Sequence, residues 1–496
     1  MDAAISSPRR FDGVVLILLS GLAFALRLGP ALGNRLQPDE ALYATWAMHI
    51  ASGRDVLLSG MPIDKPPLGV YAMAASQFVL GRVEIAARLP GFIASVVSVV
   101  LAWRWTKGLT PSSFVPHPSS LAALAMALSP FNVALGGTAL LDPLMVMFGL
   151  AACASAARGR TGWGGVFLGL AFVTKVQGVL FAPLVVMTFA FSERRQVNRT
   201  SALSARSVMR FLMGFGIVAA LLAGWSLARG GTPFWAQQAI NYGGIRLAYS
   251  AELGPRLIAW LNWLPYIFGW PIAALLALGV VALLLRARAA SRDAALDVLL
   301  MTYAIGFLAF HWLLAFPAWD RYLSILVPVM CALFARSAGV VLLHSRSQIA
   351  IKPGALWIAL IVVYIIMAPD AIRAARGEIP LGGDPASRDG IDRAAAYLRD
   401  LPIGTVVYDH WLGWELGYVL WDAPVYRAYF DTATDLARDL RAFGRTSTRY
   451  VVMPAGESPA KIERAIGLEG FRLEPALTTR NRYNRPTFSV YRIAER

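Results

Sequence analysis

Cysteine and glycine-rich phosphate loops are scarce in this sequence. The two cysteines among 496 residues, Cys153 and Cys331, lie inside apolar runs with no His or Cys at metal-ligand spacing. We therefore interpret both as small buried hydrophobic residues rather than as metal ligands. No GxGxxG or GxxxxGK stretch occurs in the C-terminal part, so the sequence gives nucleotide binding there little support. We also find no internal repeat and no low-complexity tract.

Acidic residues are outnumbered by basic ones. The chain has 46 Lys and Arg against 30 Asp and Glu, a formal net charge of +16. Such a charge suits nucleic-acid binding, but here the basic residues form short clusters between apolar blocks. That pattern is typical of cytoplasmic loops that face anionic lipid, so we expect membrane lipids and no nucleic acid as partners.

Apolar residues are abundant: 57% of the chain is hydrophobic and the mean hydropathy is +0.55. One soluble core could not bury this surface, so the sequence predicts a mainly α-helical, polytopic membrane protein. With about 20 apolar residues per span, we predict about eleven transmembrane helices, at residues 13–30, 86–105, 119–137, 140–157, 162–175, 178–192, 208–228, 260–285, 295–316, 321–343 and 355–369.

The basic clusters predict the orientation. The densest ones follow the fourth, sixth, eighth and tenth predicted spans, and the positive-inside rule assigns them to the cytoplasm. The N-terminus is then inside and the C-terminus outside. If the run between Arg158 and Arg194 were one span rather than two short helices, every later assignment would invert. The sequon at 198–200 falls in a predicted cytoplasmic loop, so we interpret it as chance.

This topology predicts that isolated charges converge on the outer face. The first run is interpreted as an uncleaved signal anchor rather than a cleaved signal, because many further spans follow. We expect the protein in the bacterial cytoplasmic membrane, with its active site facing the periplasm or exterior. The outer face would receive the loop 31–85, the link at Asp142, the turn at Lys175, the loop 229–256 and Asp320-Arg321.

The composition changes after about residue 370. Charges become frequent, and short β-type runs such as TVVYDH, PVYRAYF, YVVMPA and PTFSVYRI alternate with helical patterns such as DRAAAYLRDL and TDLARDLRAFG. We predict a transmembrane domain over 1–370 and a small extracytoplasmic α/β domain over 371–496.

Two motifs lie in the first outer loop. Asp39-Glu40 precedes Tyr43 and Trp46 on a predicted amphipathic helix along the interface; the structural alternative is that these acids cap that helix after Pro38. Asp64-Lys65-Pro66-Pro67 combines an acid and a cation with a backbone stiffened by prolines. Its alternative is a polar turn before the next helix.

Further lone charges lie in apolar surroundings, where each costs about 2.5–3.5 kcal/mol on insertion scales. Asp142 is either a functional acid or the N-cap of a helix with Pro143 at its first position. Asp320-Arg321-Tyr322 either binds a ligand or places an arginine among lipid phosphates. Weaker candidates are Arg88, Lys175 and an aromatic loop with Tyr242, Arg246 and Tyr249, whereas His311 is interpreted as a satisfied core histidine.

The order of these motifs resembles the GT-C superfamily of membrane glycosyltransferases, in particular the branch of protein O-mannosyltransferases and lipid A aminoarabinose transferases. The resemblance covers about residues 13–345. Asp64 stands where Glu is common, and Ser324-Ile325 replace a Leu-Pro. The matching motifs are Asp39-Glu40, Asp64-Lys65-Pro66-Pro67, Ala87-Arg88-Leu89-Pro90, LLDPLMVMF, GLAFVTKVQGVLFAPLV and DRYLSILVP.

The resemblance implies transfer of a sugar from a polyprenyl-phosphate donor to a protein, lipid or glycan hydroxyl, with inversion. Cations would bind the departing phosphate and a carboxylate would take the acceptor proton. We assign catalysis to Asp39, Glu40 and Asp142. Phosphate binding is assigned to Lys65 and Arg321, with Arg88 or Arg246 as helpers. Supporting positions are Asp64, Tyr43, Lys175 and Tyr322.

Three alternatives remain open. A transporter or flippase of a lipid-linked sugar would place its charges near mid-membrane on broken helices within repeated halves, which the sequence does not favour. A ligase or polymerase of surface polysaccharide would keep the fold and change the reaction. A scaffold that presents the C-terminal domain would leave the charged motifs without a purpose. We expect no required cofactor, although the clustered acids leave a divalent cation open.

Overall fold

The computed structural model describes residues 8–110, 117–197, 204–269, 271–287, 292–346 and 355–496. The sequon at 198–200 and the basic residues Arg199, Arg288 and Lys352 lie outside this range. The chain forms two compact units. A bundle unit contains residues 1–32 and 49–381, and a C-terminal unit contains residues 33–48 together with 382–496. The predicted division at 370/371 stays a prediction.

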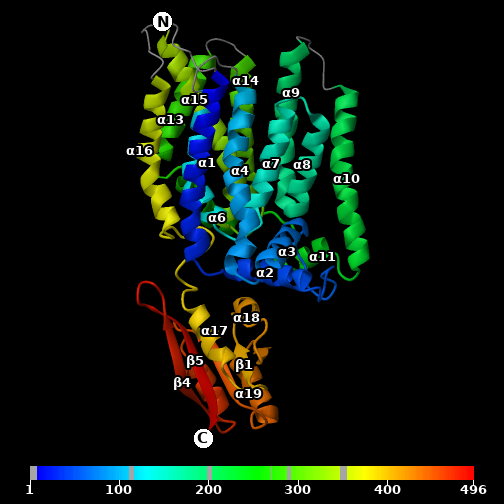
Figure 1. The fold of residues 1–496 in the computed structure, drawn as a ribbon, viewed down its shortest axis with the longest axis vertical. Coiled ribbons are helices and arrows are strands. Elements are labelled where there is room, and N and C mark those ends of the chain that lie inside the picture. The colour runs from blue at the N-terminus through cyan, green and yellow to red at the C-terminus, as the bar shows by residue number, and fades with distance from the viewer. Residues whose placement is uncertain (1–7, 111–116, 198–203, 270, 288–291, 347–354) are drawn as a thin grey trace. The chain divides into compact units, whose positions relative to one another are not determined.

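The bundle unit is built from apolar helices that run side by side (Figure 1). Helix α4 packs against α3, α5 and α7, and α8 packs between α7 and α10. The helices that cover the predicted spans are α1 (Pro8–Gly33), α4 (Glu84–Leu109), α5 (Ser119–Leu128), α6 (Pro130–Gly136), α7 (Asp142–Ala156), α8 (Thr161–Thr174), α9 (Ala182–Val197), α10 (Ala205–Arg229), α12 (Ser250–Trp263), α13 (Ile272–Ala287), α14 (Arg292–Leu313), α15 (Leu326–Arg346) and α16 (Ala355–Ala375).

Each predicted span coincides with one of these helices or with a bent pair. Within the described residues, 6 helices are long and apolar enough to cross a membrane, or up to 8 if α5 with α6 and α12 with α13 each form one span. The predicted spans at 140–157, 162–175 and 178–192 correspond to apolar helices of 10–17 residues. A multi-pass membrane protein is therefore confirmed, whereas the count of eleven stays a prediction.

The buried charged side chains described below form hydrogen bonds or ion pairs, as a low-dielectric interior requires. Arg27 of α1 is fully buried and donates to Ser95 Oγ at 2.6 Å and to backbone carbonyls of α5. Asp297 of α14 pairs with Arg286 and Arg336. Cys153 and Cys331 are fully buried free thiols, as predicted, and His311 Nδ1 contacts the carbonyl of Phe307 at 2.9 Å, which confirms a satisfied core histidine.

One end of the bundle carries shorter elements: α3 (Leu68–Leu80), η1 (Val176–Phe181), α11 (Phe234–Tyr242), η2 (Leu264–Ile267) and η3 (Asp320–Ile325). Arg229, the last residue of α10, binds the loop that contains Leu58 and Met61. Its guanidinium donates to the carbonyls of Leu58 at 2.9 Å, Thr232 at 2.7 Å and Met61. The loop that leads to Asp64-Lys65 is thus held by α10.

Helix α2 (Pro38–Ala51) differs from the prediction. An interfacial helix needs one polar exposed face, but α2 is buried around its circumference, through Glu40, Ala41, Tyr43, Ala44, Thr45, Trp46 and Ala47. The prediction of an amphipathic helix was wrong, because the small and aromatic residues of α2 pack on every side.

The C-terminal unit contains a five-stranded sheet in the order β2-β1-β3-β5-β4. Strands β1 and β2 and strands β1 and β3 are parallel, while β5 is antiparallel to β3 and β4. The strands are β1 (Val406–Asp409), β2 (Tyr426–Tyr429), β3 (Arg449–Pro454), β4 (Phe471–Arg480) and β5 (Pro486–Glu495), and the helices are α17 (Ile391–Arg399), α18 (Gly413–Val419), α19 (Ala433–Phe443) and α20 (Ala460–Gly467).

Alternating side chains of the sheet enter two apolar cores. Val407 and Val452 pack with α17 and α18, and Tyr408 and Val451 pack with α19 and α20. This period of two is what a sheet covered on both faces requires. The predicted small α/β domain is confirmed, with four predicted strands and two predicted helices in place; β4, α18 and α20 were missed.

Candidate active site

The Asp64-Lys65 motif is buried and faces the aromatic loop around Tyr242. Lys65 Nζ lies 2.6 Å from Asp64 Oδ2 and 3.0 Å from the hydroxyl of Tyr242, the last residue of α11. Asn241 Nδ2 donates to Asp64 Oδ2 at 3.2 Å. Pro66 and Pro67 limit the backbone after Lys65, and its ammonium group contacts Asp64 and Tyr242.

A second buried pair lies at the turn between α8 and η1. Lys175 Nζ is 2.7 Å from Asp142 Oδ1, and both side chains are at most 5% exposed. Gly178 makes the turn possible, since a Cβ there would lie 2.3 Å from the backbone of Ala171 in α8. Its amide donates to the carbonyl of Lys175 at 2.7 Å. Asp142 is the first residue of α7, where an acid also complements the helix dipole.

Aromatic residues of the segment before α15 connect the two pairs. The ring of Trp319 meets that of Tyr242 edge to face at 6.0 Å, and the Arg321 guanidinium lies over Trp319 at 4.4 Å. Lys175 Nζ lies 5.1 Å from the ring centre of Tyr322. Arg321 and Lys65 are also close enough to Lys175 to repel its charge. Three cations from distant parts of the sequence therefore form one group, which we call the cation cluster: Lys65, Lys175 and Arg321.

Two predicted helper cations make other contacts. Arg88 is buried, donates to the carbonyl of Ala31 at 3.0 Å and lies 3.8 Å from Glu84, which joins α4 to the end of α1. Arg246 is exposed and binds Glu252 through two hydrogen bonds of 2.7 and 2.8 Å. These contacts fit structural roles for both arginines, and their roles in phosphate binding stay predictions.

The predicted acidic pair belongs to the C-terminal unit. Asp39 is half-buried in the first turn of α2, and Glu40 is buried and accepts the amide of Gln37 at 3.0 Å. Tyr43 packs against Trp46 with ring centres 5.7 Å apart. Glu40 thus caps the helix start, as the structural alternative proposed.

Sequence reasoning missed three residues that hold the site. Asn241 adjoins the flagged Tyr242, and Trp319 adjoins Asp320-Arg321, so proximity to a motif was the available signal. From the sequence, Arg229 was predicted only as the start of the loop 229–256. Its position directly after a long apolar run could have marked it as a candidate.

A cavity of about 380 Å³ begins beside η3 and follows the apolar face of α15. Leu326, Met330, Leu333 and Ser337 line it at one-turn spacing, and residues of α13 and α14 close it. Its other end reaches Asp297. From Leu326 to Ser337 the helix rises by about 16 Å, so this is a long, narrow, apolar space.

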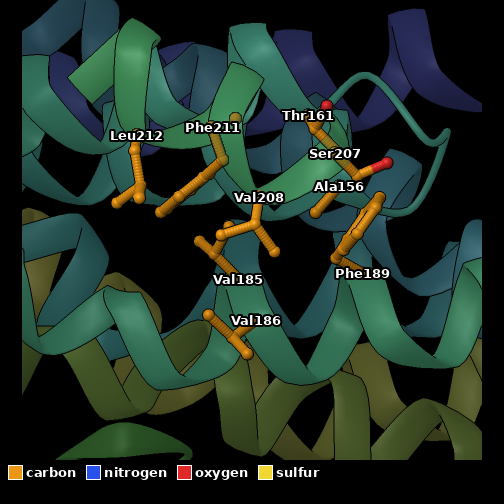
Figure 2. A pocket seen from close by; sticks show the side chains of 10 residues that line it. Ala156, Thr161, Val185, Val186, Phe189, Ser207, Val208, Phe211 and Leu212 are labelled. Carbon is orange, nitrogen blue, oxygen red and sulfur yellow. The ribbon is translucent and has the colours of Figure 1, made fainter. Parts of the chain in front are cut away.

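A second cavity, of about 200 Å³, lies between α7, α8, α9 and α10 (Figure 2). Val185, Val186, Phe189 and Phe211 supply much of its apolar wall. It opens beside Thr161 at the start of α8, whereas Lys175 follows the end of that helix. This cavity is therefore about one helix length, roughly 20 Å, from the cation cluster and has no charged group for a phosphate.

The family model of dolichyl-phosphate-mannose-protein mannosyltransferases matches residues 64–223. This range begins at the Asp64-Lys65 motif and contains Asp142 and Lys175. Among solved structures, ArnT from Cupriavidus metallidurans in the apo state aligns over 96% of this chain and 97% of its own, with a TM-score of 0.59 and 16% identity. The chain therefore shares the fold of the ArnT structure, and residues 64–223 are similar to the mannosyltransferase family.

The chain also aligns with the Cupriavidus metallidurans ArnT structure bound to undecaprenyl phosphate, with a TM-score of 0.55, 14% identity and 98% coverage of both chains. A curated relative from Edwardsiella ictaluri, strain 93-146, is named undecaprenyl phosphate-alpha-4-amino-4-deoxy-L-arabinose arabinosyl transferase. It is 30% identical over 176 residues, which is 32% of this chain. The match spans 31% of that relative's length, about a third.

Proposed function

We propose that this chain is a glycosyltransferase of the GT-C superfamily, which moves a sugar from a polyprenyl-phosphate donor to a hydroxyl acceptor. The observation that carries the proposal is the cation cluster, together with a long apolar cavity whose lining on α15 begins at Leu326, five residues after Arg321. A polyprenyl phosphate has the same two parts, an anionic head and a long apolar chain.

The cation cluster suits the departing phosphate. Lys65 and Lys175 already bind carboxylates, Asp64 and Asp142, which keep the two ammonium groups in place without a ligand. A donor phosphate would compete with Asp64 for Lys65, and Arg321 would add a fork of donors. Stabilising the charge that develops on the leaving phosphate lowers the barrier to cleavage of the glycosyl bond.

The apolar cavity suits the polyprenyl chain. It starts beside Leu326, one residue after η3 with Arg321 and Tyr322. A lipid whose phosphate lies at the cluster would enter this space directly. Burial of its methyl and methylene groups would contribute binding energy of about 0.8 kcal/mol per buried CH₂.

Asp39, a half-buried carboxylate in the first turn of α2, is proposed as the general base for the acceptor hydroxyl. Glu40 accepts the amide of Gln37, and Asp142 pairs with Lys175. Removal of that proton while the sugar–phosphate bond breaks gives attack from the opposite face and inversion at the anomeric carbon. The acceptor is a protein, lipid or glycan hydroxyl.

We propose that the reaction needs no divalent cation. Asp64 and Asp142 each pair with a lysine, Lys65 and Lys175. Treatment of the purified protein with EDTA should leave turnover unchanged, whereas loss in EDTA and recovery with Mg²⁺ or Mn²⁺ would contradict the proposal.

We further propose that the site and the C-terminal unit face the exterior of a bacterial cytoplasmic membrane. The support is the sequence distribution of basic clusters, which alternate with the segments that form the site.

The experiment uses the full chain in lipid nanodiscs with undecaprenyl-phosphate-linked sugars, an aminopentose and mannose, and measures release of undecaprenyl phosphate. Lys65→Ala and Arg321→Ala should each lower turnover by about 10²-fold or more. Lys461→Ala, at an exposed lysine of α20, is the matched control. Wild-type turnover in both site variants would move the phosphate site elsewhere. Vesicle transport of the donor without sugar release would instead identify a transporter.

A further inference from the structure

The stretch that carries Asp39 is fastened to the C-terminal end of the chain. Residues 33–48 and 382–496 form one compact unit. Three side chains attach residues 33–37 to residues 382–496. Arg482 binds Gly33 and Asn34, Arg35 pairs with Asp392 at 2.8 Å, and Gln37 Nε2 donates to the carbonyl of Asp384 at 3.0 Å. Residues 33–37 all lie within six residues of Asp39.

Arg482 makes the most contacts of the three. Its Nε and Nη2 donate to the two carboxylate oxygens of Asp389 at 2.7 and 2.8 Å, and its amide donates to Asp389 at 3.0 Å. The same guanidinium donates to Asn34 Oδ1 at 3.2 Å and to the carbonyl of Gly33 at 3.2 Å. The planar fork therefore uses one edge to fix itself on Asp389 and the other to hold the start of the Asp39 stretch.

The support beneath Arg482 is a closed turn between β4 and β5. The amide of Asn481 donates to the carbonyl of Arg485 at 2.8 Å, and Asn481 Oδ1 accepts the amides of Tyr483 and Arg485. These bonds fix the backbone on both sides of Arg482. The turn therefore presents the guanidinium in one orientation.

We propose that Arg482 is a positioning residue for Asp39. By holding Gly33 and Asn34 on the C-terminal unit, it fixes the segment from which α2 begins. Glu40 then binds the Gln37 amide and sets the first helical turn. This inference rests on the proposed function, in which Asp39 takes the acceptor proton, and it gives the C-terminal unit a part in the reaction.

Lysine cannot replace Arg482. A single ammonium group lacks the planar fork that reaches Asp389 on one side and Asn34 with Gly33 on the other. We therefore expect Arg482→Lys to behave like Arg482→Ala in turnover, although it keeps the charge. Asn34→Ala removes one hydrogen-bond acceptor of Arg482 and should lower turnover by a smaller factor.

The experiment measures kcat, KM for the donor, and donor binding with the full chain in nanodiscs. Arg482→Ala should lower kcat by at least about tenfold, the scale expected for a misplaced catalytic group, and leave donor binding within about twofold of wild type, because the phosphate site lies in the bundle. Arg472→Ala, at an exposed arginine of β4 that pairs with Glu474, is the matched control. Wild-type kcat in both Arg482 variants would overturn the inference.

A double variant separates positioning from general stability. If Arg482 acts through Asp39, then Arg482→Ala should cause no further loss in an Asp39→Asn background. Equal fractional losses in both backgrounds, or a parallel loss of donor binding, would contradict a positioning role. If Arg482→Ala does not accumulate as folded protein, Asn34→Ala decides by the same readouts.

The failure of this inference differs from failure of the proposed function. Full activity in Asp39→Asn would remove the general-base assignment itself. An inactive Asp39→Asn together with a fully active Arg482→Ala would leave that assignment standing and reject the role of Arg482 alone.

Discussion

At the scale of single residues, several buried charges of the bundle form ion pairs. Removing one partner of such a pair destabilises the protein. Asp142 and Lys175 are both buried with their charged atoms 2.7 Å apart. Removing one partner leaves the other charge in a low-dielectric interior, which costs far more than the pair itself contributes.

We therefore predict that Asp142→Asn and Lys175→Met each destabilise the protein by about 3–5 kcal/mol. The double variant should be less destabilised than the sum of the two, because no unpaired charge remains. Thermal unfolding of the four proteins in detergent measures this cycle. Strict additivity would show that the two side chains do not depend on each other.

Lone charges were the residues that the sequence singled out as candidates for the site, and their roles in catalysis and phosphate binding stay predictions. Asp64, Lys65, Asp142 and Arg321 each interrupt an apolar or proline-stiffened stretch, and insertion costs make that pattern informative. Asn241 and Trp319 were not singled out, because an amide or an aromatic residue in a loop costs little and is common. Their roles depend on contacts between segments far apart in the chain.

At the scale of elements, the turn between α8 and η1 depends on one glycine. Gly178 lies so close to α8 that a methyl group would overlap the backbone of Ala171. Overlap with backbone atoms cannot be relieved by rotating a side chain. The turn that presents Lys175 would have to move instead.

Gly178→Ala should lower stability by about 1–3 kcal/mol and reduce donor turnover with it. The control is Gly216→Ala in α10, where nothing lies within 4 Å of the added methyl group. That change should be neutral or stabilising by up to about 1 kcal/mol. Equal effects of the two substitutions on unfolding temperature would rule out the close approach as the cause.

The contact between Asp389 and Arg482 predicts a pH dependence. Burial alone would raise the pKa of Asp389, but the hydrogen bonds and charge of Arg482 outweigh it and lower this pKa below 3.8. A lowered carboxyl pKa contributes stability above the unfolded pKa and loses it as the pH falls through the folded pKa.

Asp389→Asn should therefore lower the unfolding temperature at pH 7, and the difference from wild type should shrink below about pH 3.8. Thermal unfolding of the full chain, followed by far-UV circular dichroism at several pH values, tests this. A difference that stayed constant across the whole pH range would contradict the ion pair as its origin.

Among the elements of the C-terminal unit, β4 shows why some strands are hard to predict. Its sequence FRLEPALTTR contains Pro475 and has no regular alternation, since Phe471 and Thr479 are its buried residues. As an edge strand with register shifts, β4 tolerates a proline that a central strand would exclude. The central strands β1 and β3 carry continuous apolar runs and were predicted.

At the scale of the whole molecule, fold class followed from hydropathy, but the division into units did not. Long apolar runs need only local sequence to be recognised. The grouping of residues 33–48 with 382–496 involves side-chain contacts between residues 347 to 448 positions apart, which no sequence periodicity indicates. The number of spans is equally hard to predict, because short helices such as α7 and α8 resemble incomplete spans.

The proposed orientation can be measured with cysteine labelling. Both native cysteines are fully buried, so a single added cysteine should dominate the signal. Leu468→Cys, at a position 84% exposed in the C-terminal unit, should react with a membrane-impermeant maleimide added to intact spheroplasts. Labelling only after lysis would place the C-terminal unit in the cytoplasm.

The contact between Arg482 and Asn34 joins positions 448 residues apart. During synthesis the ribosome makes Asn34 448 positions before Arg482. A chain that stops before Arg482 would contain every described apolar helix and the cation cluster, yet its Asp39 stretch would lack the arginine that holds it. Under the proposed roles, such a fragment binds the lipid donor but transfers little sugar, so catalysis begins only after Arg482 has been made.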